Sequence, residues 1–148
     1  MKKHANIPIF IPHVGCPNDC VFCNQRKIYG LQTSVTHEED KKLISEQLSY
    51  LPTEEREVEV AFFGGSFTGL PLELQEEFYQ VADSFRPQID GIRLSTRPDY
   101  MNQTTLALAK QWGVTTMELG VQSAVDEVLT KNRRGHTFAQ SVAAVQEI

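Results

Sequence analysis

Short apolar runs alternate along the chain with longer segments in which apolar residues recur at helical spacing. The runs are rich in β-branched and aromatic residues, which predicts strands. They span residues 7–11, 58–63, 92–94 and 114–121. The first run is branched and apolar with proline at its edges, so we expect that strand to be buried on both faces.

The segments that follow the runs have the apolar spacing of amphipathic helices. The predicted helices span residues 37–51, 71–86, 103–112, 126–131 and 138–148. Thr36 and Glu39 form a capping box at the start of the first helix, and Pro52 ends it. Asn102 and Thr137 are the expected N-caps of two later helices.

The order of elements is strand then helix, four times over. This order predicts an α/β fold with a parallel sheet, right-handed crossovers and outer helices. The polar or glycine-rich turns all follow strands, at residues 12–35, 64–69, 95–99 and 120–123. Because ligands bind at the carboxyl ends of parallel strands, we expect the functional site at that rim.

The three cysteines of the chain, Cys16, Cys20 and Cys23, lie in the long turn after the first strand at C-x3-C-x2-C spacing. Three thiolates this close can hold one metal centre and leave a coordination position open. A zinc site would need a fourth ligand, such as His4 or His13. A [4Fe–4S] cluster with three protein thiolates fits the open position directly.

The composition of the 148-residue chain is ordinary for a soluble protein, with 41% apolar and 22% charged residues. The net charge of −5 excludes a general polyanion-binding field. No apolar run reaches the roughly 18 residues of a membrane span, and no signal-peptide core follows the basic start. We therefore predict a cytoplasmic protein without a membrane partner, in which an odd-numbered cysteine cluster indicates metal binding or catalysis rather than disulfides.

The cysteine spacing, with an aromatic residue before the third cysteine, resembles that of the radical S-adenosylmethionine superfamily. Four further motifs strengthen the resemblance: FGGSFT at 63–68, TRPD at 96–99, ELGVQS at 118–123 and RGHT at 134–137. They are similar to the branch around the Elongator catalytic subunit and its bacterial relatives, which is close to the oxygen-independent coproporphyrinogen oxidases. The resemblance covers essentially the whole chain.

The resemblance implies a partial TIM-type (β/α) barrel, cut to about four β/α units, in which residues 1–148 form the N-terminal part of a core domain. Cys16, Cys20 and Cys23 would bind a [4Fe–4S] cluster that reductively cleaves S-adenosylmethionine to a 5′-deoxyadenosyl radical. The radical would abstract hydrogen from a substrate, with tRNA modification favoured, and flavodoxin or ferredoxin would donate the electron. The alternatives are a coproporphyrinogen III oxidase-like decarboxylation and, in another class, a non-catalytic zinc or iron–sulfur binding module.

The resemblance also assigns roles around the cofactor. Gly64 and Gly65 would let the backbone approach the methionine end of S-adenosylmethionine closely. Ser66 would stand near its amino group, Gln122 would bind the ribose hydroxyls, and Arg134 would meet the carboxylate.

Three further positions complete the expected cofactor site. Phe10 and Phe22 would flank the cluster and the adenine, with Phe22 shielding the cluster from water. Ser95 stands where relatives often carry a glutamate that contacts the cofactor, and it brings no charge. Arg97 either compensates for that loss or caps the rim through solvent.

Two other rim groups, Glu118 and His136, are interpreted as structural, because lone polar residues at strand ends usually are. A barrel that stops after four units would leave the fourth strand with an unpaired edge, and we expect such a chain to self-associate there.

Overall fold

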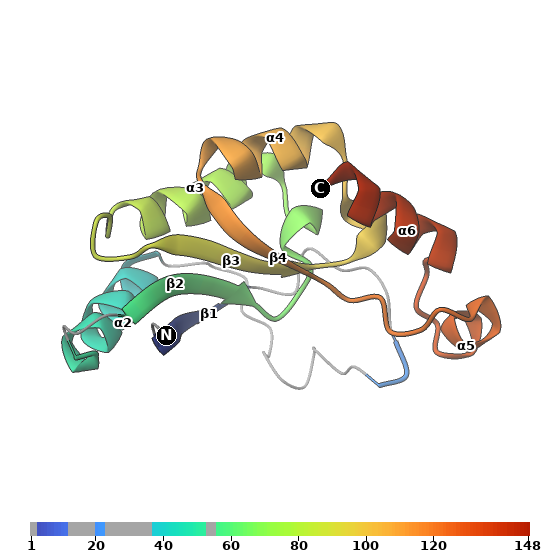
Figure 1. The fold of residues 1–148 in the computed structure, drawn as a ribbon, viewed down its shortest axis with the longest axis horizontal. Coiled ribbons are helices and arrows are strands. Elements are labelled where there is room, and N and C mark those ends of the chain that lie inside the picture. Colours follow the sequence, from blue (N-terminus) through green and yellow to red (C-terminus); the bar gives the residue numbers. More distant parts are fainter. Residues whose placement is uncertain (1–2, 12–19, 23–36, 53–55) are drawn as a thin grey trace.

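A computed structural model of the chain describes residues 3–11, 20–22, 37–52 and 56–148. Its centre is a parallel sheet with the strand order β1-β2-β3-β4 (Figure 1). The strands are β1 Lys3–Phe10, β2 Arg56–Phe63, β3 Gly91–Thr96 and β4 Val114–Leu119. Neighbours in the sequence are therefore neighbours in the sheet, as the repeated strand–helix order predicts.

The helices match the predicted ranges closely. They are α2 His37–Tyr50, α3 Leu72–Asp83, α4 Gln103–Gln111, α5 Asp126–Lys131 and α6 Phe138–Glu147, with short 3₁₀ turns η2 Phe67–Gly69 and η3 Pro98–Tyr100. The capping box predicted at Thr36 lies outside the described residues. Asn102 and Thr137 both cap their helices, as predicted, and each forms a reciprocal capping box with the residue three positions on.

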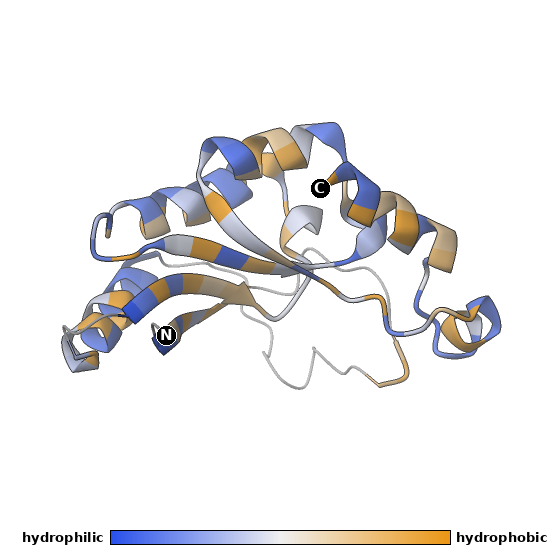
Figure 2. Cartoon of the chain, in the orientation of Figure 1, coloured by the Kyte–Doolittle hydropathy of each residue, from blue (hydrophilic) through white to orange (hydrophobic). Residues whose placement is uncertain are grey.

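One face of the sheet packs against the helices and forms the core. Apolar and polar residues alternate along β3, as the colours of its ribbon show (Figure 2). An aromatic cluster fills the space between β2, η2 and α3, and consists of Phe62, Phe67, Phe78 and Tyr79. Large side chains buried like this each contribute about 1.5–3 kcal/mol of hydrophobic stabilisation, which holds the helices on this face of the sheet.

The opposite face of the sheet carries many polar side chains, and this overturns one expectation. The first strand was predicted to be buried on both faces, but only Ile7 and Ile9 are buried in β1, and the side chain of Phe10 is 61% exposed. The prediction is wrong because alternate residues of β1 point to the polar face. The strand also begins earlier than predicted, since polar residues from Lys3 pair with β2 from Arg56.

A continuous set of polar contacts crosses this second face. Glu59 is almost fully buried, and its carboxylate lies 3.0 Å from His4 Nε2 and 2.9 Å from Arg93 Nε. The hydroxyl groups of Thr115 and Thr116 donate to the same carboxylate. We call this set, from β1 to β4, the Glu59 network; it ties all four strands together on the polar side of the sheet.

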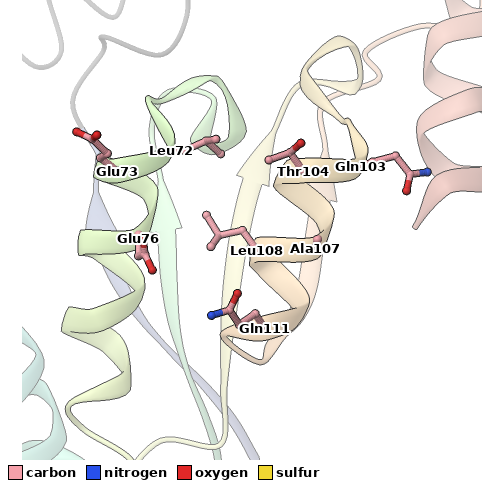
Figure 3. Close-up of a pocket in the computed structure, with 8 residues that line it drawn as sticks. All are labelled: Leu72, Glu73, Glu76, Gln103, Thr104, Ala107, Leu108 and Gln111. Atoms are coloured by element: carbon pink, nitrogen blue, oxygen red, sulfur yellow. The ribbon is translucent and has the colours of Figure 1, made fainter.

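Two grooves lie away from the predicted site. One runs between α3 and α4 (Figure 3), encloses about 650 Å³, and is lined by residues such as Glu73, Glu76 and Gln111. The other lies beside β4, between α4 and the end of α6.

Among the described strands β4 pairs with β3 alone, and the predicted self-association at its other edge stays a prediction. Over the described part of the chain, no helix combines the length and apolarity needed to cross a membrane.

The N-cap of α4 gives a direct test of this local structure. Asn102 Oδ1 accepts a hydrogen bond from the backbone N–H of Thr105 at 2.9 Å. We expect Asn102→Ala to lower the free energy of unfolding by about 1 kcal/mol, because an N–H in the first turn of the helix loses its acceptor. Urea denaturation measures the change, and Asn102→Asp, which keeps the acceptor, is the control. Equal losses in both variants would contradict a capping role.

Candidate metal and cofactor site

The turns after the strands meet at one rim of the sheet. Ser66, in the turn after β2, places its Oγ 2.7 Å from Thr96 Oγ1 at the end of β3. Ser66 Oγ also accepts a hydrogen bond from the backbone N–H of Arg97 at 3.1 Å. Thr68 also hydrogen-bonds the Thr96 hydroxyl. The rims of β2 and β3 are thus joined by buried hydroxyl groups.

The glycine turn after β2 has the backbone that glycine favours. Gly64 has a φ of +111°, which side-chain-bearing residues rarely adopt. Ser66 follows at a buried position where its own hydrogen bonds are already supplied by the protein. The cofactor contacts predicted for Gly64, Gly65 and Ser66 stay predictions.

Cys20 is the predicted metal ligand that the structure describes, while Cys16 and Cys23 lie outside the described residues. Its thiol is buried and donates to the carbonyl of Arg133 at 3.7 Å. The next residue, Val21, donates its backbone N–H to the carbonyl of Asn132 at 3.2 Å. The segment 20–22 (blue in Figure 1) therefore lies against the turn that follows α5.

Arg134, in the same turn, directs its guanidinium towards Cys20. Nη1 donates to Cys20 Sγ at 3.8 Å, and Nη2 donates to the carbonyl of Gly120 at 2.6 Å. The side chain is 8% exposed, and its Nε is buried with no hydrogen-bond partner. No carboxylate of the described residues forms an ion pair with it. A buried cation without a counter-ion fits an anionic group at this position.

Gly120 makes this approach possible. A Cβ at residue 120 would lie 2.5 Å from Arg134 Nη2 and 3.4 Å from Gln122 Nε2. Both predicted cofactor-binding side chains therefore converge on Gly120, just beyond β4. Gln122 itself has a φ of +67°, so its backbone is held in a conformation that few such residues adopt.

Arg97 holds the Arg134 turn in place from the β3 side. It is buried and pairs with Asp99 through Nε at 2.9 Å and Nη2 at 3.1 Å. Nη2 also donates to the carbonyl of Arg134, and the guanidinium lies 5.5 Å from the centre of the Tyr100 ring. The interpretation of Arg97 as a solvent-exposed cap of the rim is therefore wrong, because its partners draw it inward.

The structure also describes three further predicted site residues, Ser95, Phe10 and Phe22. Ser95 donates to Glu118 Oε2 at 3.0 Å on the polar face of the sheet. Glu118 also accepts from Arg93, and so belongs to the Glu59 network. Phe10 and Phe22 are largely exposed, the latter by 54%. The cofactor roles of Ser95, Phe10 and Phe22 stay predictions.

His136, which the sequence led us to interpret as structural, is buried close to Arg134, Arg97 and Asp99. Neither ring nitrogen makes a well-aligned hydrogen bond with the described residues, although the backbone of Val121 lies near the ring. Burial, and then the positive charge of Arg134, lower the pKa of His136 below its usual value, which favours the neutral imidazole. Its sequence signal was a single histidine before a helix cap, which does not distinguish a buried site residue from a structural one.

The fold and the site together define a class. The chain is an α/β protein with a partial parallel barrel, in which a buried arginine lies against a cysteine of a C-x3-C-x2-C motif at the strand-end rim. A family model, described as the Radical SAM superfamily, matches residues 10–148. The chain therefore belongs to the Radical SAM superfamily, which confirms the family predicted from the motifs.

Similar proteins agree with this placement. The chain is 35% identical over 111 residues to Elongator complex protein 3 of Saccharomyces cerevisiae, covering 62% of this chain and 20% of the relative. It is 26% identical over 120 residues to a tRNA uridine(34) acetyltransferase of Methanocaldococcus infernus, covering 68% and 22%. The chain thus spans about a fifth of the length of these curated relatives.

Solved structures confirm the fold class. Elp3 of Methanocaldococcus infernus matches with a TM-score of 0.62 and 19% identity, over 97% of this chain and 34% of that one. Methylornithine synthase matches with a TM-score of 0.59 and 22% identity, over 98% and 41%. The predicted partial (β/α) barrel of parallel strands is confirmed.

Proposed function

We propose that residues 1–148 form the N-terminal part of a radical S-adenosylmethionine core domain, in which Cys16, Cys20 and Cys23 bind a [4Fe–4S] cluster. The observation that carries the proposal is the buried guanidinium of Arg134 at 3.8 Å from Cys20 Sγ, at the strand-end rim. A cluster with an anionic cofactor on its open position gives that cation a counter-ion.

The cofactor site is assembled by residues that the fold brings to the rim. When bound, the cluster would supply one electron for cleavage of S-adenosylmethionine into methionine and the 5′-deoxyadenosyl radical, which would abstract hydrogen from the substrate. Arg134 keeps a buried, unpartnered Nε for the carboxylate of the cofactor, and Gln122 is held beside it for the ribose. Gly64 allows backbone approach at the methionine end, since it has no side chain at a φ of +111°.

The substrate class we propose is tRNA. Support comes from the names of two relatives, an Elongator complex protein and a tRNA uridine(34) acetyltransferase. The net charge of −5 means that phosphate contacts would come from local basic groups or from other parts of the protein. We further propose a cytoplasmic enzyme that receives its electron from a flavodoxin or ferredoxin.

The test is anaerobic reconstitution of the full-length gene product with iron and sulfide, followed by dithionite and S-adenosylmethionine. We expect about four irons per chain, and 5′-deoxyadenosine that accumulates only when reductant is present. A demonstrable cluster without any 5′-deoxyadenosine would refute the catalytic proposal. A colourless protein with one equivalent of zinc would favour the non-catalytic binding module instead.

A further inference from the structure

Arg134 is a buried cation placed against the sulfur of a predicted cluster ligand. Its Nη1 lies 3.8 Å from Cys20 Sγ, within hydrogen-bonding range for sulfur. Once iron is bound, the sulfur can only accept hydrogen bonds, so this donor contact is the one that persists. We propose that Arg134 is a positioning residue that donates to the Cys20 sulfur and raises the reduction potential of the cluster; this inference rests on the proposed function.

The contact is part of a wider docking of the cysteine turn. Cys20 and Val21 both meet carbonyl groups of the turn at 132–133, while Arg134 supplies the side-chain contact. Residues 20 and 134 are 114 positions apart in the sequence. This turn therefore places one cluster ligand relative to the rim of β4.

Several neighbours fix the guanidinium at this position. Nη2 is held by the carbonyl of Gly120 at 2.6 Å, which leaves Nη1 to point to the sulfur. The backbone of Arg134 is held by Arg97, which is itself fixed by both carboxylate oxygens of Asp99. An arginine held at both ends loses little freedom when it donates to a ligand, so the contact is preorganised.

The sign of the effect follows from the charges. Reduction adds one negative charge to the cluster, and a fixed positive charge nearby stabilises the reduced state more than the oxidised state. Hydrogen bonds to cluster sulfurs act in the same direction, and both effects strengthen where water is excluded. Arg134 therefore makes the cluster easier to reduce, which assists the electron transfer that the proposed reaction requires.

The experiment is an EPR-monitored redox titration of the reconstituted full-length protein without S-adenosylmethionine, so that any carboxylate contact of Arg134 does not enter. We expect Arg134→Gln to shift the midpoint potential to a more negative value. The matched control is Arg133→Gln, which removes the same charge one residue earlier from an exposed side chain. We expect its potential to equal that of the wild type, since solvent screens the lost charge.

Two further variants keep the inference testable if Arg134→Gln assembles poorly. Gly120→Ala pushes the guanidinium from its site by close contact with Nη2 but keeps its charge, and we expect a smaller negative shift. Arg134→Lys keeps a positive charge but cannot donate to both Cys20 Sγ and the carbonyl of Gly120. We expect its midpoint potential to lie between those of the wild type and Arg134→Gln. Wild-type potentials in the Arg134 and Gly120 variants would overturn the inference.

These outcomes are separate from those that test the proposed function. If the wild-type protein binds no cluster or yields no 5′-deoxyadenosine, the proposed function fails. If the wild-type protein is active and the Arg134→Gln cluster keeps its potential, the tuning role of Arg134 alone is wrong.

Discussion

Replacing Glu59 with alanine is expected to destabilise the fold by about 3 kcal/mol, at the lower end of the cost of breaking a buried ion pair. Glu59 is only 2% exposed, and its carboxylate accepts hydrogen bonds from Thr115, Thr116 and Arg93. Without it, the two hydroxyl groups lose their charged acceptor on the polar face of the sheet. Arg93 keeps its pair with Glu118, which limits the loss.

Urea denaturation measures this effect, and the strand supplies its own control. Glu57 lies two residues earlier on the same face of β2 and is exposed. Glu57→Ala removes the same charge, and we expect it to change the unfolding free energy by less than about 0.5 kcal/mol. Similar losses in the two variants would mean that the Glu59 network contributes nothing specific.

The same network gives a pH dependence. Burial alone would raise the pKa of Glu59, but hydrogen bonds from Thr115, Thr116 and Arg93 outweigh it and hold the pKa below the usual 4.5. A carboxyl with a lowered folded-state pKa stabilises the protein above its unfolded-state pKa, and that stability is lost as the pH falls through the folded-state value. We therefore expect the advantage of wild type over Glu59→Gln to shrink as the pH falls below about 4.5.

The sequence predicted the order of elements well because each strand and helix carries a local signal. Hydrophobic spacing located the helices, and the N-caps Asn102 and Thr137 marked where α4 and α6 begin. These signals are local because a helix boundary depends on residues close by in the chain. The start of β1 was missed because Lys3 to Asn6 is polar, and what makes it a strand is backbone pairing with β2, some fifty residues away. Pairing of this kind leaves no mark in the local pattern.

Partners distant in the sequence explain the remaining differences at the site. Arg97 was expected either to compensate for the charge missing at Ser95 or to cap the rim through solvent. The neighbouring Asp99 and the carbonyl of Arg134, 37 positions away, instead hold its side chain inward. The convergence of Gln122 and Arg134 depends on Gly120, whose missing side chain leaves room for the guanidinium. Residue types therefore pointed to this rim, while contacts such as that between Cys20 and Arg134 join segments far apart in the chain.

Cys20→Ala is expected to abolish the cluster in the full-length protein. Three thiolates are the proposed protein ligands, and a cube that loses one of them has a second iron without a protein ligand and becomes labile. The substitution also removes the acceptor of Arg134 Nη1, which leaves a buried cation still further from any counter-ion. Iron and sulfide analysis after anaerobic reconstitution, with the visible absorption spectrum, measures the loss.

Val21→Ala is the matched control for this substitution. Val21 is the neighbour of Cys20, its side chain is 64% exposed, and its contact with Asn132 is made by the backbone N–H. We expect this variant to retain the wild-type iron content. Wild-type iron in Cys20→Ala as well would show that other residues hold the metal, and the assignment of the cysteine motif would then be wrong.

The open coordination position separates a catalytic cluster from a passive one. With three cysteine ligands, one iron has no protein thiolate, and adding S-adenosylmethionine to the reduced wild-type cluster should change its EPR spectrum. A cluster whose four irons are all bound by the protein has no position for the cofactor and should not respond. Since Arg134 and Gln122 converge at the rim beside Cys20, we expect Gln122→Ala to weaken this spectral response while leaving the iron content unchanged.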